Sequence, residues 1–290
     1  MVDQRPTRGQ RPERSAPDPT RVPTRVPARV HAAEVVRSAQ HPLLKRMGAI
    51  LAGKERGACV LEGDRLIEDA RASGTELEAL LVSTEREERA RELERAGLAV
   101  TRISADLLDR RSALKTSPGI AAIARAPEFA GFERLATTPD ALVLVVAGVA
   151  DPGNLGALAR SAEAAGAAGL VLLPPTVHPF GDKALRGSMG SLLRLPVASA
   201  KSAAEAVAAL RERGFRMVAA ATRGGSAPSR FDWSGRVALW VGSETGLEPG
   251  EMRRFERVTL PMAGRVESLN VTVAASLLLF AAGRAGAEPR

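Results

Sequence analysis

The sequence predicts an α/β protein with two domains, on three observations. Apolar segments of strand length alternate with segments of helix length along residues 33–125 and again along 141–290. Residues 126–140, which have turn chemistry and no periodicity, separate the two series as a linker. The chain has 290 residues, 45% of them hydrophobic, which is enough apolar material for two cores.

The first 32 residues are expected to form a disordered basic arm. Six prolines interrupt them, and seven arginines against three acidic residues leave a charge of +4, half of the +8 of the whole chain. The arm has too little apolar surface to offset the entropy that ordering would cost. It could attract phosphates without sequence preference, or it could be a solvated tail without a role. The sequence favours neither reading.

The first domain, residues 33–125, is predicted to be a mainly parallel sheet covered on both faces, because strands and helices alternate. Its sequence contains no recognisable acid–base pair, nucleophile or phosphate loop, so a binding module is favoured over a catalytic one. We expect strands at 58–62, 77–82, 98–103 and 119–124, and helices at 43–51, 64–72, 85–95 and 107–114.

The second domain, residues 141–290, repeats the alternation with more apolar strands. We expect strands at 141–149, 169–173, 216–221, 237–241 and 258–260, and helices at 157–165, 183–186, 203–213 and 271–282. The last helix has only Thr272 and Ser276 as polar residues, so it is predicted to be buried on all sides. It is far shorter than the ~20 residues that cross a bilayer.

Composition narrows the function. Cys59 is the only cysteine and the three histidines are scattered, so we expect no internal disulfide and no metal site. The net charge of +8 suggests a polyanionic partner. Aromatic residues make up only 3% of the chain, which disfavours RNA binding by stacked aromatic platforms. No signal peptide or membrane span is evident, so a cytoplasmic location is expected.

Three strands of the second domain are followed by loops rich in Gly, Asn, Ser and Glu, at residues 151–156, 242–247 and 261–270. The carboxyl ends of parallel strands meet at one edge of a sheet, where ligands bind. The first loop does not give G-x-G-x-x-G, nor does it contain the G-K-[ST] of a phosphate loop. An adenine-type ligand held mostly by backbone groups remains.

These loops resemble the three motifs of the SpoU/TrmH family of RNA ribose 2′-O-methyltransferases, which belongs to the SPOUT superfamily. They occur in the family's order and at fitting distances, and the resemblance covers roughly residues 36–285. Motif 1 is DPGNLG at 151–156 with Arg160, motif 2 is GSETGL at 242–247, and motif 3 is LPM at 260–262 with SLNV at 268–271.

The resemblance implies a fold and an activity. The first domain would be an L30e-like α/β/α substrate-binding domain, and the second a SPOUT domain with a parallel sheet and a C-terminal trefoil knot. The cofactor would be S-adenosylmethionine, and the protein would be a homodimer. The substrate would be the ribose 2′-hydroxyl of an RNA, with ribosomal RNA favoured over transfer RNA; no DNA or membrane partner is expected.

The resemblance also assigns roles to individual residues. Arg160 would be the catalytic arginine; a guanidinium gives up its proton reluctantly and is a poor base, so holding a phosphate or the developing alkoxide is the better role. Asn154 would orient Arg160 or the ribose, and Glu244 would pair with a polar group of the site. Ser268 and Asn270 would face the methionine end of the cofactor, although either could be no more than a helix N-cap. The adenosine pocket would include Thr222, Gly242, Ser243, Leu260, Met262, Ser268 and Leu269.

Other functions remain possible. A nicotinamide-dependent oxidoreductase would share the α/β architecture, but the dinucleotide fingerprint is missing. An RNA-binding protein of this fold without catalysis is a second possibility, against which the intact motif residues speak. Within the methyltransferases, a transfer RNA enzyme is the alternative to a ribosomal RNA enzyme.

Overall fold

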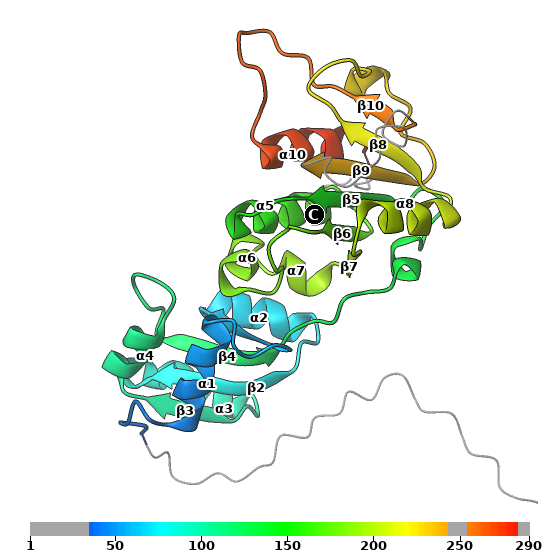
Figure 1. Cartoon of the computed structure of the whole chain (residues 1–290). Coiled ribbons are helices and arrows are strands. Elements are labelled where there is room, and N and C mark those ends of the chain that lie inside the picture. Colours follow the sequence, from blue (N-terminus) through cyan, green and yellow to red (C-terminus); the bar gives the residue numbers. More distant parts are fainter. Residues whose placement is uncertain (1–34, 243–253, 284–290) are drawn as a thin grey trace, which may run out of the picture.

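A computed structural model of the protein describes residues 35–242 and 254–283, and these form two α/β domains (Figure 1). The basic arm expected at residues 1–32 lies outside this range. The first domain contains a four-stranded sheet of order β1-β4-β2-β3. Its strands are β1 (Ala58–Glu62), β2 (Leu77–Ser83), β3 (Val100–Ile103) and β4 (Ile120–Arg125).

The prediction of a mainly parallel first sheet is wrong. β4 lies between β1 and β2 and runs antiparallel to both, and only β2 and β3 pair in parallel. The alternation of strands and helices suggests parallel crossovers, but it does not reveal where a strand inserts. Here β4 begins beside the ends of β1 and β2, where the N–H groups of Gly63 and Ser83 donate to the carbonyls of Ile120 and Gly119.

Helices cover both faces of this sheet, which gives the expected α/β/α layering. α1 (Pro42–Leu51) and α4 (Ala105–Arg111) share one apolar cluster with the sheet, and α2 (Asp64–Ala72) and α3 (Glu87–Arg95) pack on the other face. A short 3₁₀ turn, η1 (Thr84–Arg86), leads into α3. The 3.6-residue spacing of apolar side chains explains why these helices each bury one face.

The second domain has a six-stranded sheet in which every pairing is parallel. The strand order is β10-β8-β9-β5-β6-β7. The central strands are apolar on both faces because both are covered, as parallel sheets require. The strands are β5 (Leu142–Ala147), β6 (Gly169–Leu173), β7 (Val197–Ser199), β8 (Arg216–Ala220), β9 (Val237–Gly242) and β10 (Glu256–Val258).

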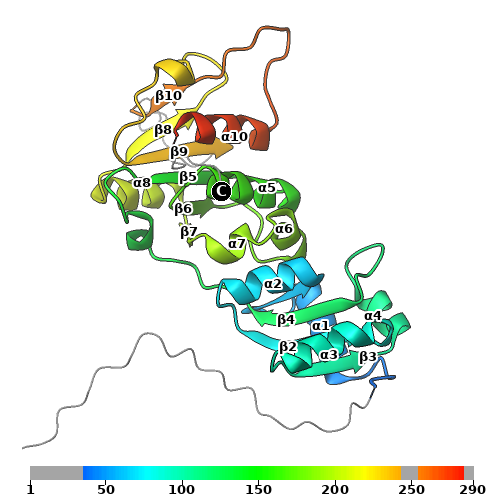
Figure 2. The same cartoon turned by 180° about the vertical axis from the view of Figure 1, so that it is seen from behind.

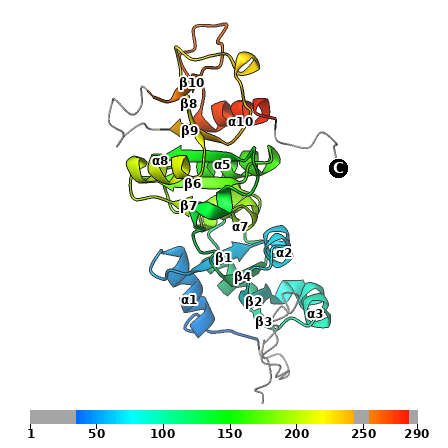
Figure 3. The ribbon, with the colours of Figure 1, turned by 90° about the vertical axis from the view of Figure 1, so that its right-hand side faces the viewer.

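Helices α8 and α10 lie on opposite sides of this sheet (Figure 3). α8 packs on one face, whereas α5, α6, α7 and α10 share a cluster with the other. The bounds are α5 (Pro152–Ala164), α6 (Asp182–Gly187), α7 (Ser191–Arg194), α8 (Ala203–Glu212) and α10 (Val271–Ala281). The sequence did not indicate α7 or β7, because four and three residues are too few to show a period.

The segment between the domains is packed against the second domain. It contains the 3₁₀ turn η2 (Phe132–Leu135), whose Leu135 is fully buried in the cluster under α8. The backbone N–H of Ala130 donates to the carbonyl of Val197 at 2.8 Å. The expected linker is therefore packed on the second domain through Leu135 and Ala130. The domain limits 33–125, 126–140 and 141–290 stay predictions.

The prediction that the last helix is buried on all sides is wrong for the single chain. α10 buries Ala275, Leu278 and Leu279, but Val273, Leu277 and Phe280 are 47%, 50% and 58% exposed. An apolar composition shows that a helix avoids water, but not what covers it. Among the described residues, no helix is long and apolar enough to span a membrane.

Candidate active site

An open pocket, with about 450 Å³ of empty space that includes its mouth to solvent, lies at the carboxyl ends of β8 and β10, beside α10. Its walls are mainly apolar, and its polar side chains come from Thr222, Glu267 and Ser268. This composition is typical of sites for small organic ligands. It is lined by Ala220, Ala221, Thr222, Val258, Leu260, Met262, Glu267, Ser268, Leu269, Ala274 and Leu278.

Most of the residues predicted to bind the cofactor come together in this pocket. Five of them share its walls, although the segments that carry them are about 40 residues apart in the sequence: Thr222, Leu260, Met262, Ser268 and Leu269. Ser243 lies outside the described residues. The structure thus groups these side chains, while their role in binding stays a prediction.

Gly242 ends β9 and does not line the pocket. Its φ is +95°, and a Cβ placed there would come within 2.1 Å of the carbonyl oxygen of Ala147 on the neighbouring strand β5. Only glycine allows this close approach of two strand ends. Gly242 therefore shapes the edge of the sheet at which the motif loops leave.

Motif 1 and motif 3 meet through Thr272. The Oδ1 atom of Asn270 caps α10 by accepting from the backbone N–H of Thr272 at 2.8 Å. The Thr272 hydroxyl in turn lies 3.4 Å from both the carbonyl and the Oδ1 oxygen of Asn154, at the start of α5. Asn270 is thus the helix cap that the sequence allowed, and the helix it caps contacts Asn154 through Thr272.

Helix α5 carries motif 1 and is held in place by its N-terminal cap and by its packing. Asp151 caps it by accepting from the N–H of Asn154 at 2.8 Å and also pairs with Lys183 at 2.9 Å. A Cβ on Gly156 would lie 2.5 Å from the carbonyl oxygen of Ala184, so α5 and α6 touch backbone to backbone. Further along, Ser161 bonds to Ser276 of α10 at 2.7 Å.

Arg160 projects from α5 and is exposed to solvent. Within residues 35–242 and 254–283, no hydrogen bond or ion pair engages its guanidinium. Glu244, its expected partner, lies outside the described residues. A guanidinium without a partner in the part of the chain that the structure describes is suited to a ligand with negative charge.

The sequence did not indicate Glu267 or the small and apolar residues of α10 that face the pocket, Ala274 and Leu278. Glu267 directly precedes Ser268, so its position within motif 3 was a signal that could have drawn attention to it. Its carboxylate suits hydroxyl or ammonium groups of a bound ligand. Ala274 and Leu278 follow from the 3.6-residue period, since both lie on one face of α10.

Comparison with known proteins now identifies the family. Residues 141–280 match the SpoU rRNA Methylase family, and residues 52–122 match the MRM3-like substrate binding domain. Over 250 residues the chain is 31% identical to the Bacillus subtilis 23S rRNA (guanosine(2553)-2′-O)-methyltransferase RlmP, covering 84% of this chain and 97% of that protein. The chain belongs to the SpoU rRNA methylase family. It is an S-adenosylmethionine-dependent RNA methyltransferase, which excludes the oxidoreductase alternative.

Solved structures of this SpoU-family fold agree. The S-adenosylmethionine-bound rRNA methyltransferase from Sinorhizobium meliloti matches with a TM-score of 0.75 at 26% identity, over 86% of this chain and 97% of that one. The SpoU methyltransferase AviRb from Streptomyces viridochromogenes, also solved with the cofactor, matches with a TM-score of 0.74 at 28% identity, over 84% and 98%. The predicted fold class and cofactor are confirmed, while the trefoil knot stays a prediction.

The pocket suits the cofactor of this SpoU-family enzyme. It is open to solvent, and its walls are mainly apolar with a few polar side chains, as in sites for small organic ligands. Leu260, Leu269 and Leu278 offer apolar surface for an adenine ring, and Glu267 and Ser268 offer polar atoms for its ribose or amino acid part. The chemistry supplied by the bound cofactor is an electrophilic methyl group.

Proposed function

We propose that this protein methylates the ribose 2′-hydroxyl of a guanosine in 23S ribosomal RNA. The observation that carries this proposal is the similarity to RlmP over almost its full length. The similarity includes both the catalytic and the substrate-binding domain, so it extends beyond the cofactor site. Ribosomal RNA as substrate also implies that the protein acts in the cytoplasm.

Arg160 is the residue we assign to the reacting oxygen. A ribose hydroxyl is a weak acid, so its oxygen gains negative charge as it loses its proton and attacks the methyl group. A guanidinium stabilises that charge, or the adjacent phosphate, with two parallel donors. Its exposure on α5, without a partner among the described residues, leaves both donors free.

Asn154, Ser268 and Asn270 are assigned supporting roles. The Asn270–Thr272–Asn154 chain of contacts ties the start of α10 to the start of α5. It would keep motif 3, which lines the pocket, at a constant distance from the helix that bears Arg160. Ser268 lies in the pocket wall and would contact the cofactor. For Glu244 we retain the role of a partner for Arg160 or the substrate.

We also propose that the protein is a homodimer that uses the outer face of α10. Val273, Leu277 and Phe280 are spaced as i, i+4 and i+7, so they form one exposed apolar stripe. Leu269, 37% exposed in the pocket wall, lies just before this helix. A second copy would cover the stripe and also border the pocket.

Sedimentation of Leu277→Asp tests the dimer. A carboxylate in a buried apolar contact carries a desolvation cost, so the variant should sediment as a monomer while the wild type sediments as a dimer. Ala208→Asp, on the exposed side of α8, is the matched control and should remain dimeric. A monomeric wild type, or a dimeric Leu277→Asp, would remove this part of the proposal.

The substrate is tested by mapping ribose methylation in RNA. A strain without the gene should lack one 2′-O-methylguanosine of 23S ribosomal RNA, and complementation should restore it. A missing methyl group in transfer RNA would show the alternative substrate. An unchanged map in both RNAs, with no methyl transfer in vitro, would favour a protein that binds RNA without catalysis.

A further inference from the structure

The two domains share one apolar core where α2 meets α6 and α7 (Figure 2). Leu66 and Ile67 of α2 belong to the same buried cluster as Leu185 and Leu192. α6 also packs against β1 of the first domain. The substrate-binding domain is therefore docked on the catalytic domain through side chains, in addition to the covalent connection.

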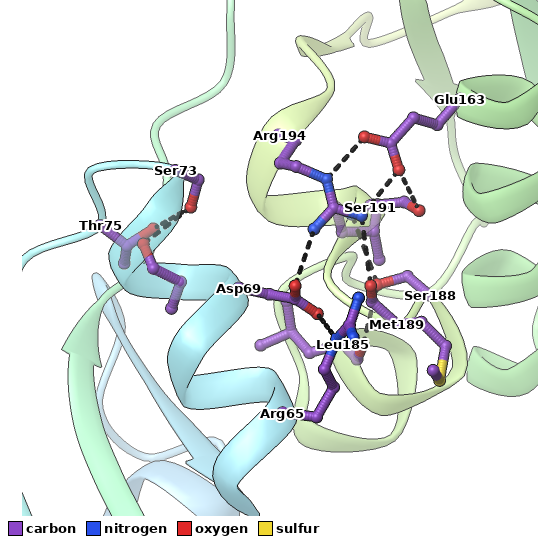
Figure 4. A network of polar contacts seen from close by, with 12 residues as sticks. Arg65, Asp69, Ser73, Thr75, Glu163, Leu185, Ser188, Met189, Ser191 and Arg194 are labelled. Carbon is purple, nitrogen blue, oxygen red and sulfur yellow. Dashed lines mark hydrogen bonds and ion pairs between the residues drawn. The ribbon is translucent and has the colours of Figure 1, made fainter. Parts of the chain in front are cut away.

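A polar bridge with Arg194 of α7 at its centre borders this contact (Figure 4). Its guanidinium donates to the two carboxylate oxygens of Glu163 on α5 at 2.6 and 2.8 Å. Its Nη1 atom lies 3.8 Å from the carboxylate of Asp69 on α2. The side chains are 34%, 31% and 15% exposed, so water screens these charges only in part. One arginine thus joins helices of both domains.

The local sequence makes room for the bridge. Gly190 has a φ of +81°, and a Cβ on it would come 2.6 Å from Nη1 of Arg194 and 2.9 Å from Cβ of Asp69. The neighbouring Ser191 hydroxyl donates to Glu163 at 2.6 Å. The carbonyl of Met189 accepts from Arg194 at 3.2 Å. The turn between α6 and α7 thus supplies one acceptor for Arg194 and also a hydroxyl donor that holds Glu163, its main partner.

The bridge reaches the helix of the proposed catalytic arginine. Glu163 follows Arg160 by three residues, and side chains at this spacing are neighbours on a helix surface. Gly153 and Gly156, which pack against α6, lie on the same face of α5. The contact that holds the substrate-binding domain therefore acts on the stretch of α5 that carries Arg160.

We propose that Arg194 is a positioning residue that sets which ribose is methylated, by fixing the substrate-binding domain relative to α5 through Asp69 and Glu163. This inference rests on the proposed function. In this proposal the bridge makes the two domains move as one unit, so RNA held by the first domain is presented to Arg160 at one distance. A loosened bridge would let neighbouring riboses reach the site.

Asp69→Ala is the variant that tests this proposal, because it removes the first-domain end of the bridge and leaves the Arg194–Glu163 pair intact. Arg65→Ala is the matched control. Arg65 is the other partner of Asp69, at 3.2 Å, but it belongs to the same helix and is 77% exposed. Asp69→Glu keeps the charge and should recover part of the wild-type behaviour.

The substrate is 23S ribosomal RNA purified from the strain without the gene. Asp69→Ala should lower kcat/KM for this RNA roughly tenfold and spread methylation to adjacent riboses. The affinity for S-adenosylmethionine, measured by calorimetry, should stay unchanged, and Arg65→Ala should behave as wild type. The proposal would be overturned if Asp69→Ala kept the wild-type kcat/KM and methylated a single position. This includes the case in which Asp69→Ala lowers the Tm and changes nothing else.

A spectroscopic measurement separates this inference from the proposed function. Spin labels on Glu88→Cys of α3 and Ala208→Cys of α8 report the distance between the domains, while the native Cys59 is buried and 1% exposed. Asp69→Ala should broaden the distance distribution and Arg65→Ala should not. If the wild type modifies a different RNA, this test still decides the role of the bridge. Equal distance distributions in the wild type, Asp69→Ala and Arg65→Ala would refute the positioning role of the bridge.

Discussion

Two arginines, one in each domain, differ in what their guanidinium groups contact. In the first domain Arg102 is buried, with a side chain 8% exposed, and donates four hydrogen bonds to Glu87 and Glu94. In the catalytic domain Arg160 is exposed and has no partner among the described residues. The first arginine has used its donors to hold a helix on a sheet. The second keeps them for a ligand.

This difference indicates how to separate scaffold from site in this SpoU-family enzyme. Arg102 points from β3 to α3, and its own charge is neutralised within the domain. Arg160 projects from α5, whose described cap and packing contacts are made by other residues. Removal of the first should therefore affect stability, and removal of the second should affect the reaction.

The largest expected effect is that of Arg160→Ala on turnover. Loss of one charge-assisted contact in the transition state costs on the order of 3 kcal/mol, or about a hundredfold in rate. Single-turnover kinetics at saturating RNA measure it, and calorimetry should show wild-type affinity for the cofactor. Arg160→Lys should also turn over slowly, because a compact ammonium group does not replace the two parallel donors of a planar guanidinium. If Arg160→Ala kept the wild-type rate, the assignment would be wrong, and Asn154, Glu244 or Ser268 would have to carry the chemistry.

The second effect is a loss of stability, expected when Arg102 of the first domain is replaced. Arg102→Met leaves Glu87 and Glu94 close together without their shared cation, so we expect the Tm to fall by about 5 °C or more. Thermal unfolding followed by circular dichroism measures the change, and cofactor affinity should be unaffected. Arg110→Met is the control, since Arg110 is 78% exposed and its pair with Asp106 spans 3.9 Å. Equal melting of both variants would show that Arg102 is not a scaffold residue.

The third effect is a dependence of stability on acid. Hydrogen bonds from Arg102 lower the pKa of Glu87 and of Glu94 in the folded protein. Their contribution is therefore complete above the ordinary glutamate pKa of about 4.3 and is lost as the pH falls through the lowered values. Between pH 5 and about 3, the Tm of the wild type should fall more steeply than that of Arg102→Met. Parallel curves would disprove the linkage.

The smallest effect is expected from the basic arm. Deletion of residues 1–32 removes a charge of +4, so RNA affinity should fall modestly. The slope of log K against log salt should fall by roughly 3 in magnitude. Filter binding at several salt concentrations measures both, and methylation mapping should find the same position. A shifted position would show that the arm contributes to target choice, and an unchanged slope would identify it as a tail without a role.

Much of the fold could be predicted because its signals are local. The strands 58–62 and 169–173 and the helix 64–72 were predicted with the bounds that the structure has, since a short apolar segment or a 3.6-residue period is visible within one stretch of sequence. The order of the three motifs led to the family and to the cofactor. Residues of motif 3, together with Thr222, line one pocket because parallel strands end at one edge.

Only the tertiary structure decided how these segments meet. It inserted β4 antiparallel between β1 and β2, left one face of α10 uncovered, and placed Thr272 against Asn154 across more than a hundred residues. It also placed Asp69, Glu163 and Arg194 together, although no motif marks them as a set. Such contacts depend on strand direction and on packing between distant segments, and a local hydrophobic pattern is the same whichever neighbour a face finds.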